Sequence, residues 1–357
     1  MDESNVNKAM KSYKRKRNSL IALICFLSVV LVLLVGFTVW WQSFLGQRGT
    51  LDVSVPTLTP DQESVLLEQG DTVPPDFTGP SYTPEEAPVP EQPVPTVPSE
   101  DVVNILVVGR DSREGWQILN TDAMILCSFN KTKKTLVLTS FLRDTWVAIP
   151  GKYNERLNVP YSLGGFPLLN DTLEYNFGVR GDYNVEVDFE GFSGIIDAVG
   201  GVDINLTAAE AAHLNAMRET NPPQFQWHLK EGVNTLTGEQ ALAYARIRAL
   251  DSDFGRTNRQ RTVLRALVDK TRSLNFTQLY ALANELLPMV KTDMTDRDIT
   301  SLLLSVVTVL PELKIVDQRV PYSDQFEAAS INGKAVLVIK GDHLQSTLDR
   351  LKETIGK

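Results

Sequence analysis

Residues 102–141 read VVNILVVGRDSREGWQILNTDAMILCSFNKTKKTLVLTSF and contain the clearest strand pattern of the chain. Three short apolar runs, at 102–109, 123–129 and 135–141, are separated by polar segments. Apolar runs of this length that end at glycine or at polar turn residues are typical of buried β-strands. The stretch therefore predicts three buried strands, the last two of which are joined by a turn at 130–134.

Downstream of this stretch, predicted strands and helices alternate to the end of the chain. Further strands are expected at 146–150, 183–189, 202–206, 313–320 and 335–339. Helices are expected at 168–177, 191–199, 208–218, 238–245, 257–273, 276–290, 295–310 and 341–355. Such alternation is typical of α/β domains, in which helices pack on the faces of a sheet. We therefore expect an α/β fold with a sheet between helix layers.

The segment before residue 102 has a different composition. Residues 52–100 contain eleven of the nineteen prolines, and residues 49–109 contain eleven Asp or Glu but no Lys or Arg. Proline cannot donate to a strand ladder or continue a helix, and the negative charges repel one another. We therefore expect residues 42–101 to form an acidic, proline-rich extracellular stalk without packed helices or strands.

Residues 19–41 form an uncharged apolar run of 23 residues, which is long enough to span a membrane as a helix. A cleaved signal peptide, the alternative, would have a shorter apolar core. Six basic residues lie in segment 1–18, before the run, and very few follow it closely. The positive-inside rule therefore predicts a cytoplasmic basic tail at 1–18, a transmembrane anchor at 19–41 and a body outside the membrane.

The composition of the 357-residue chain excludes several classes of protein. Two cysteines rule out a disulfide scaffold or a Cys-rich zinc module, and three scattered histidines rule out a His-based metal motif. A net charge of −9 argues against a free-standing nucleic-acid binder. Neither a glycine-rich nucleotide loop nor a G-x-S-x-G elbow occurs, so a serine hydrolase is unsupported.

Two carboxylates lie next to the ends of predicted strands. Asp111 follows the first strand closely, and Asp122 directly precedes the second. If these strands are antiparallel neighbours, both carboxylates reach the same edge of the sheet, where ligands of open α/β sheets bind. Two carboxylates without histidine suit Mg²⁺ or Mn²⁺. The alternative is that each Asp caps a turn, because turns favour Asp.

A second group of polar residues lies in residues 241–267, which read ALAYARIRALDSDFGRTNRQRTVLRAL. The polar residues of interest in this segment are Arg246, Arg248, Asp253, Arg256, Arg259 and Gln260. We expect Asp253 and Arg256 in a loop, and Arg259 and Gln260 in the first turn of the helix that follows. Guanidinium groups bind phosphate through paired hydrogen bonds, and a helix N-terminus attracts anions. One phosphate-bearing ligand would account for these arginines together.

Two other interpretations of this segment remain open. Thr257 and Gln260 have the spacing of a capping box, which is a structural use of these residues. Six arginines within residues 246–265 could also form a nucleic-acid-binding helix. The second interpretation conflicts with the predicted position of the body outside the membrane.

Taken together, the motifs resemble the LytR-CpsA-Psr family of cell-envelope glycan transferases over about residues 102–272. The motifs that carry the resemblance are, in order, NILVVGRDSR, NTDAMILCSFN, TSFLRDTWVAIPG, RLNVPYSLGG, VDFEGFSGIIDAVGGVDI and LTGEQALAYARIR with DFGRTNRQR. Their order and spacing, behind a basic tail and one span, make the match specific. The chain departs from the family pattern at Leu142 (usually Pro), at Arg156 (often Lys) and at Val159–Pro160 (usually small residues).

The resemblance implies an architecture and an activity. It implies a catalytic domain at 102–320 with a central mixed sheet between helix layers, and a C-terminal strand–helix extension at 321–357 packed on that domain. The implied activity is transfer of a glycan phosphate from a polyprenyl-pyrophosphate carrier to a peptidoglycan sugar hydroxyl, which attaches a teichoic acid or capsule-type polymer. The implied location is the membrane of a Gram-positive-type bacterium, with the catalytic domain extracellular and no nucleic-acid partner.

The resemblance also implies roles for individual residues. The metal ligands, for Mg²⁺ or Mn²⁺, would be Asp111 and Asp122. The residues that bind the pyrophosphate would be Arg113, Arg143, Arg246, Arg248, Arg256 and Gln260. The catalytic residues would be Arg143, Arg246, Arg248 and Asp253, with Asp253 as a candidate base or orienting group.

Three other functions compete with this one. A related hydrolase would use the same cation and arginines with water as the acceptor. A non-enzymatic surface module would bind envelope polymer and regulate or scaffold its assembly. A DNA-binding transcription attenuator would require a cytoplasmic body, contrary to the predicted topology.

Overall fold

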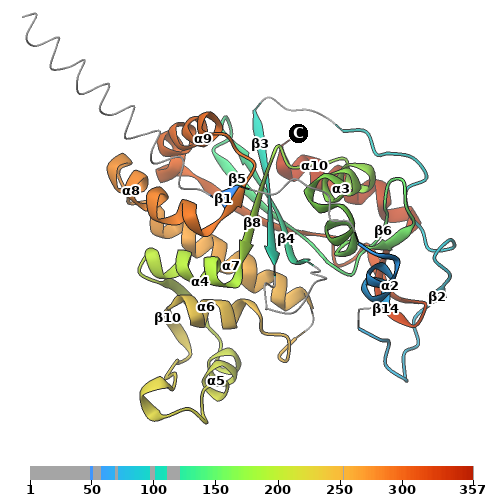
Figure 1. The fold of residues 1–357 in the computed structure, drawn as a ribbon, viewed down its shortest axis with the longest axis horizontal. Coiled ribbons are helices and arrows are strands. Elements are labelled where there is room, and N and C mark those ends of the chain that lie inside the picture. The colour runs from blue at the N-terminus through green and yellow to red at the C-terminus, as the bar shows by residue number, and fades with distance from the viewer. Residues whose placement is uncertain are drawn as a thin grey trace, which may run out of the picture. The chain divides into compact units, whose positions relative to one another are not determined.

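The computed structural model describes residues 49–50, 58–68, 71–96, 101–110, 121–251 and 253–356. Within these residues, the central feature is a mixed sheet of seven strands in the order β1-β11-β8-β3-β4-β5-β12 (Figure 1). The strands are β1 (Gly49–Thr50), β3 (Val102–Arg110), β4 (Thr121–Asn130), β5 (Thr135–Phe141), β8 (Tyr183–Asp188), β11 (Lys291–Thr292) and β12 (Lys314–Val320). The predicted central mixed sheet is confirmed, and the three strands predicted in 102–141 are its β3, β4 and β5.

The strand pairing brings five strand ends to one edge of this sheet. β4 pairs antiparallel with both β3 and β5, whereas β8 pairs parallel with β3 and β12 pairs parallel with β5. As a result, β3, β5, β8 and β12 end at the edge at which β4 begins. The strands on either side of the Asp111–Asp122 segment are therefore antiparallel neighbours, as the metal hypothesis requires.

Helices cover both faces of the sheet. On one face, α3 (Val159–Phe177) and α10 (Leu344–Ile355) pack against Leu106, Val108 and Leu126 in the main apolar core. Because side chains alternate along a strand, the residues between these point to the opposite face. That face is covered by α4 (Phe189–Ala198), α6 (Gly238–Ala245), α7 (Asp253–Thr271), α8 (Phe276–Leu286) and α9 (Asp296–Val309) (Figure 1).

Smaller sheets flank the central one. They are β13 (Phe326–Ile331) with β14 (Lys334–Ile339) and β2 (Ser81–Tyr82), β6 (Trp146–Ala148) with β7 (Asn154–Arg156), and β9 (Val202–Leu206) with β10 (Gly232–Leu236). The hairpin β13–β14 supports the loop after β5, because the backbone N–H of Leu337 donates to the carbonyl of Asp144 at 2.9 Å. α5 (Ala208–Ala216) follows β9 and, like α6, α8 and α9, begins with a capping box.

The expectation that residues 52–100 form neither a packed helix nor a ladder is wrong for the parts that the structure describes. α2 (Pro60–Glu68) buries Leu66 completely against Ile149, Val159 and Leu163. β2 pairs with β13 at the edge of its sheet. The prolines permit both elements, because Pro60 occupies the first helical position and edge strands tolerate nearby proline. The apolar residues that lie between the prolines, such as Leu66, can therefore be buried against the body of the protein.

Two helix starts also differ from the sequence prediction. α7 begins at Asp253, so Asp253 and Arg256 lie in its first turns and not in a loop. The predicted capping box is therefore wrong, and the hydroxyl of Thr257 instead donates to the carbonyl of Phe254 at 3.1 Å. α3 is divided into two helical stretches by Gly164 and by Gly165, which has φ 60°; the second stretch contains the predicted helix 168–177, whereas the first, which begins at Val159, was not predicted.

Within the ranges that the structure describes, no helix has the length and apolar character needed to cross a membrane. The predicted basic tail at 1–18 and the predicted anchor at 19–41 lie outside the described residues, so both stay predictions.

Truncation of Leu66 tests the packing of α2. We expect Leu66→Ala to lower the free energy of unfolding by about 2–5 kcal/mol, because a fully buried leucine leaves a cavity when it is truncated. The measurement is urea unfolding of the full chain. Leu304→Ala on α9, where the side chain is 54% exposed, is the matched control and should leave stability nearly unchanged. Equal unfolding midpoints for the two variants would contradict the packed position of α2.

Candidate functional site

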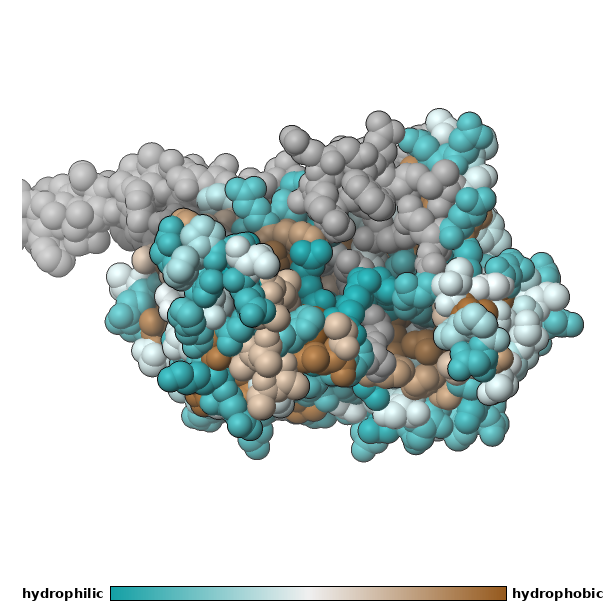
Figure 2. All heavy atoms as spheres, turned by 90° about the horizontal axis from the view of Figure 1, so that it is seen from below, coloured by the Kyte–Doolittle hydropathy of each residue, from teal (hydrophilic) through white to brown (hydrophobic). Residues whose placement is uncertain are grey.

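A pocket of about 850 Å³ lies between the sheet and the helices α4, α6 and α7. Most of its lining is apolar, and the strand and helix residues that form these walls include Val107, Ala123, Ile125, Val187, Phe192, Ile195, Leu242, Val263, Leu264 and Leu267. Protein interiors are close-packed, so a cavity of this size is far larger than a packing defect and is large enough to hold a ligand. Seen from the side on which α5 lies, apolar surface extends across the middle of the face between hydrophilic flanks (Figure 2).

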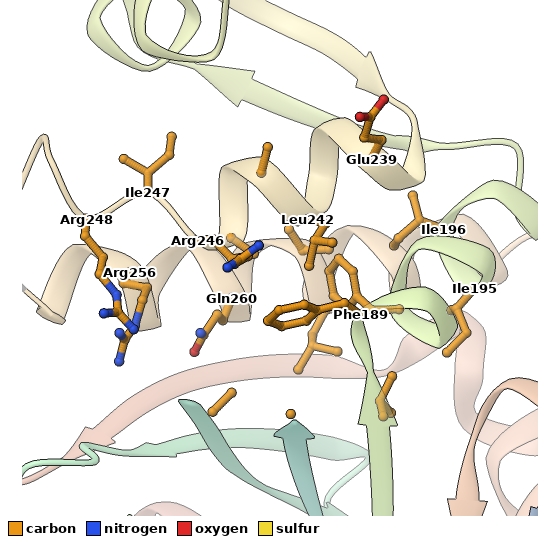
Figure 3. A pocket seen from close by; sticks show the side chains of 18 of the residues that line it. Phe189, Ile195, Ile196, Glu239, Leu242, Arg246, Ile247, Arg248, Arg256 and Gln260 are labelled. Carbon is orange, nitrogen blue, oxygen red and sulfur yellow. The ribbon is translucent and has the colours of Figure 1, made fainter. Parts of the chain in front are cut away.

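One end of the pocket is cationic. Arg246, Arg248, Arg256 and Gln260 all line it, and Figure 3 shows the side chains of Arg248 and Arg256 pointing the same way, with Gln260 beside them. The guanidinium carbon of Arg246 lies 4.3 Å from the ring centre of Phe189. Arg256 is only 2% exposed. The structure thus brings together four of the predicted ligand-binding residues at the end of an apolar cavity.

Arg259 fixes the turn between α6 and α7 that carries these arginines. Its Nε donates to Glu210 Oε1 at 2.7 Å, and its Nη1 and Nη2 donate to the two carboxylate oxygens of Asp251 at 2.9 and 2.7 Å. Nη1 also donates to the carbonyl of Ile247 at 3.2 Å. Burial lowers the pKa of Arg259, but the hydrogen bonds and charges of the two carboxylates outweigh burial and raise it. The backbone that holds Arg248 is therefore tied at both ends.

Arg143 lies at the sheet edge, two residues after β5 ends. Its Nε donates to Asp144 Oδ2 at 3.2 Å, and its Nη2 donates to Asp71 Oδ2 at 3.3 Å. The side chain is 14% exposed. In the described part of the chain, Arg143 is not among the residues that line the pocket, so the structure does not bring it into the same wall as Arg246 and Arg248.

The remaining predicted site residues are described in part or not at all. Asp111 and Arg113 lie outside the described residues. Asp122 is the second residue of β4 and Asp253 is the first residue of α7, but the structure describes only their backbone. The roles of all four stay predictions.

The strand register next to the predicted metal ligands is irregular. Arg110 and Thr121, the residues directly before Asp111 and Asp122, are paired with each other across the ladder. The register shifts there, so that Asp122 is the extra residue of a β-bulge, a feature that is frequent beside active sites. The metal site itself stays a prediction, because Asp111 and the side chain of Asp122 lie outside what the structure describes. Elsewhere, within the described ranges, no cluster of three or more His, Cys, Asp or Glu could hold a metal.

Sequence reasoning missed two residues of this region, Phe189 and Asp71, and gave a third, Arg259, the wrong role. Phe189 packs against Arg246 and lies in a motif of the resemblance, so it could have been singled out. Arg259 was expected among the arginines that face a phosphate-bearing ligand, but it is paired with Glu210, 49 residues away, and no local pattern signals such a pair. Asp71 lies in the segment predicted to be a free stalk, so no contact with Arg143 was expected.

Comparison with known proteins identifies relatives across most of the chain. A model of the LytR_cpsA_psr family matches residues 81–353. Regulatory protein MsrR of Staphylococcus aureus (strain COL) is 31% identical over 265 residues, which cover 72% of this chain and 76% of MsrR. The polyisoprenyl-teichoic acid–peptidoglycan teichoic acid transferase TagT of Bacillus subtilis (strain 168) is 33% identical over 187 residues, which cover 51% of this chain and 57% of TagT.

Solved structures agree with the sequence comparison. The structure of TagT bound to LIIa-WTA matches with a TM-score of 0.60 and 25% identity, covering 75% of this chain and 97% of that one. A structure of TagT with bound octaprenyl pyrophosphate lipid has the same fold, with a TM-score of 0.56 and 24% identity over 75% of this chain and 98% of that one. The family model, the relatives and the fold agree, and the chain belongs to the LytR-CpsA-Psr family.

Proposed function

We propose that the protein transfers a glycan phosphate from a polyprenyl-pyrophosphate carrier to a sugar hydroxyl of peptidoglycan. The observation that carries this proposal is the apolar pocket of about 850 Å³ with Arg246, Arg248 and Arg256 at one end. A polyprenyl pyrophosphate joins a long hydrocarbon chain to a compact anionic head, so it matches both parts of the pocket. The name of TagT, a teichoic acid transferase, supports the same donor class.

The proposed reaction is a phosphoryl transfer. The acceptor hydroxyl oxygen forms a bond to the phosphorus that carries the glycan, and the bond from that phosphorus to the bridging oxygen breaks. Polyprenyl phosphate leaves with the electron pair, and the hydroxyl proton passes to a base, for which Asp253 is the candidate. Such transfers depend on positioning and on stabilisation of negative charge, and the cationic end of the pocket supplies the second.

Arginine side chains are suited to binding and stabilising the phosphate groups of the donor. Guanidinium groups donate to phosphate oxygens in pairs and keep their charge at physiological pH. Because Arg259 ties the turn that carries Arg248 to Glu210 and Asp251, the donors are placed before the ligand arrives. Arg143 at the sheet edge would add a further cation near the reacting phosphorus.

A divalent cation belongs to the proposal. Asp111 and Asp122 would hold Mg²⁺ or Mn²⁺, as the register of β3 and β4 allows. The cation would neutralise charge on the pyrophosphate oxygens when bound.

The cellular setting is proposed from the sequence. A retained anchor at 19–41 with a cytoplasmic tail would place the catalytic domain on the outer side of the membrane, where a lipid-linked donor and peptidoglycan meet. This arrangement is that of a Gram-positive-type cell envelope.

A regulatory role is the second candidate function, because the relative MsrR carries the name of a regulatory protein. A module that only binds lipid-linked polymer would use the same pocket without turnover. A hydrolase would differ only in using water as the acceptor. The three functions give different products. A transferase joins glycan to peptidoglycan, a hydrolase releases glycan phosphate, and a binding module forms neither product.

Removal of one arginine tests whether Arg246, Arg248 and Arg256 bind the phosphate groups of the donor. We expect Arg248→Met to lower kcat/KM for transfer about 100-fold, because a charged donor aimed at the reacting phosphate is lost. Transfer is followed as release of polyprenyl phosphate and attachment of glycan to a peptidoglycan oligomer, using a synthetic polyprenyl-pyrophosphate disaccharide. Arg180→Met, at an exposed ion pair with Glu174, is the control and should match the unaltered chain. Equal rates for both variants would refute the phosphate-binding role of Arg248.

Metal removal tests the cation. Chelation should abolish transfer, and Mg²⁺ or Mn²⁺ should restore it. Asp122→Asn should weaken this restoration by raising the Mg²⁺ concentration needed for half-maximal rate, because one charged ligand is replaced by a neutral amide. Full activity in excess chelator would refute the metal site.

Membrane topology can be mapped separately. A reporter enzyme that is active only outside the cytoplasm, fused after Lys357, should be active in intact cells. A signal only from a cytoplasmic reporter at the same position would rule out every envelope function proposed above.

A further inference from the structure

A cluster of aromatic and cationic side chains lies beside the cationic end of the pocket. Phe254 is in the first turn of α7, two residues before Arg256. The guanidinium carbon of Arg319, near the end of β12, lies 4.5 Å from the ring centre of Phe254. The ring of Phe326, at the start of β13, lies 5.4 Å from that of Phe254 and is tilted by 39°. All three side chains are partly exposed, so they form a surface and not a sealed core.

Two buried polar side chains lie in the same region without a full set of partners. Arg261 is 5% exposed, and within the part of the chain that the structure describes its Nε and Nη1 have no hydrogen-bond partner. Its Nη2 makes one long contact, 3.4 Å, to Asn258. Ser140 is 1% exposed, and its hydroxyl likewise lacks a partner among the described residues. Buried donors are normally satisfied, so donors of this kind are available to a bound group.

Strand register places these residues together. Ile125, Ser140 and Arg319 form one row, because Ile125 is paired with Ser140 and Ser140 with Arg319. Paired residues share a face of the sheet, and Ile125 lines the pocket beneath α7. The row therefore lies on the face that α7 covers, and Arg261 of α7 is close enough to Arg319 for their charges to interact.

The charge balance near Arg261 favours an incoming electron-rich group. The nearby carboxylate of Asp317 is already engaged by the guanidinium of Arg265. Burial lowers the pKa of Arg261, Asp317 opposes this shift, and the positive charge of Arg319 adds to it. A buried guanidinium next to a second cation is unfavourable unless something else accepts its hydrogen bonds.

The position of the cluster relative to the pocket suggests which group it binds. The pocket lies over β8, β3 and β4, whereas Ser140 and Arg319 lie on β5 and β12, the next two strands of the sheet. In phosphoryl transfer, the attacking oxygen approaches roughly opposite the leaving group. If the polyprenyl phosphate leaves on the pocket side, the attacking hydroxyl arrives from the side of this cluster.

We propose that Ser140, Arg261 and Arg319, bordered by Phe254 and Phe326, form the subsite for the acceptor sugar. This inference rests on the proposed transferase function. A sugar ring presents flat apolar C–H faces, which pack against aromatic rings and guanidinium planes, and hydroxyl oxygens, which accept hydrogen bonds from Arg261 and Ser140. The subsite also gives the C-terminal segment a part in function, because Phe326 belongs to it.

The test separates acceptor binding from donor binding in the full chain. KM is measured for a peptidoglycan oligomer at saturating donor and for a synthetic polyprenyl-pyrophosphate disaccharide at saturating acceptor. We expect Arg319→Gln and Phe326→Leu each to raise the acceptor KM about tenfold, as the loss of one charged or aromatic contact predicts, while the donor KM changes less than twofold. Phe326→Leu keeps an apolar side chain of similar size, so it guards against misfolding of the other variant.

Arg350→Gln is the matched control, because Arg350 also stacks on an aromatic ring, that of Tyr322 at 4.0 Å, but belongs to α10 on the other side of the sheet. It should leave both KM values unchanged. An unchanged acceptor KM in both variants, or an equal rise in the donor KM, would overturn the acceptor subsite while leaving the transferase intact. If the unaltered chain joins no glycan to peptidoglycan, the proposed function itself fails, which is a different result.

Discussion

The ion pairs of Arg259 with Glu210 and Asp251 are the constraint on which the candidate site depends. Arginines placed close together repel one another, and a flexible turn would let them separate into solvent. Arg259 ties the turn to α5 and to the start of α7, so the positive charges stay at the end of the pocket. Removal of both carboxylates would leave a buried, unpaired guanidinium, which is far more costly than the loss of an exposed ion pair. The positions of Arg246 and Arg248 therefore depend on Arg259, Glu210 and Asp251, which do not line the pocket.

The sequence predicted the central sheet well, because β3, β4 and β5 are nearly continuous apolar runs bounded by glycine or polar turn residues, the typical pattern of buried strands. α6 was predicted with its observed bounds, 238–245, because Thr237 and Gln240 form a capping box that marks its start. β13 was missed because its six residues mix polar and apolar side chains, although it pairs with β14 directly after it in the chain. The start of α7 was misplaced because Gly255 and the neighbouring Asp residues have the composition of a loop.

The sequence predicted which polar residues belong to the candidate site, but it predicted neither the pocket nor the long-range contacts. The grouping of Arg246, Arg248, Arg256 and Gln260 followed from their spacing, and the structure places all four at one end of the pocket. The pocket itself left no sequence signal, because the residues that line it, such as Val107 and Leu267, look like ordinary core. The contacts of Arg143 with Asp71 and of Phe254 with Phe326 join segments 72 residues apart, which no local pattern reveals.

The packing of the proline-rich segment has a practical consequence for recombinant fragments. β2 covers one edge of β13, and Leu66 and Val94 fill apolar sites on the body of the protein. A fragment that begins at Val102 would expose that strand edge together with these apolar sites. Unpaired edges and apolar patches are the surfaces through which β-proteins aggregate. The soluble unit for biochemical work therefore begins upstream of Leu58, and aggregation of a shorter fragment would reveal a missing strand and helix, not an unstable fold.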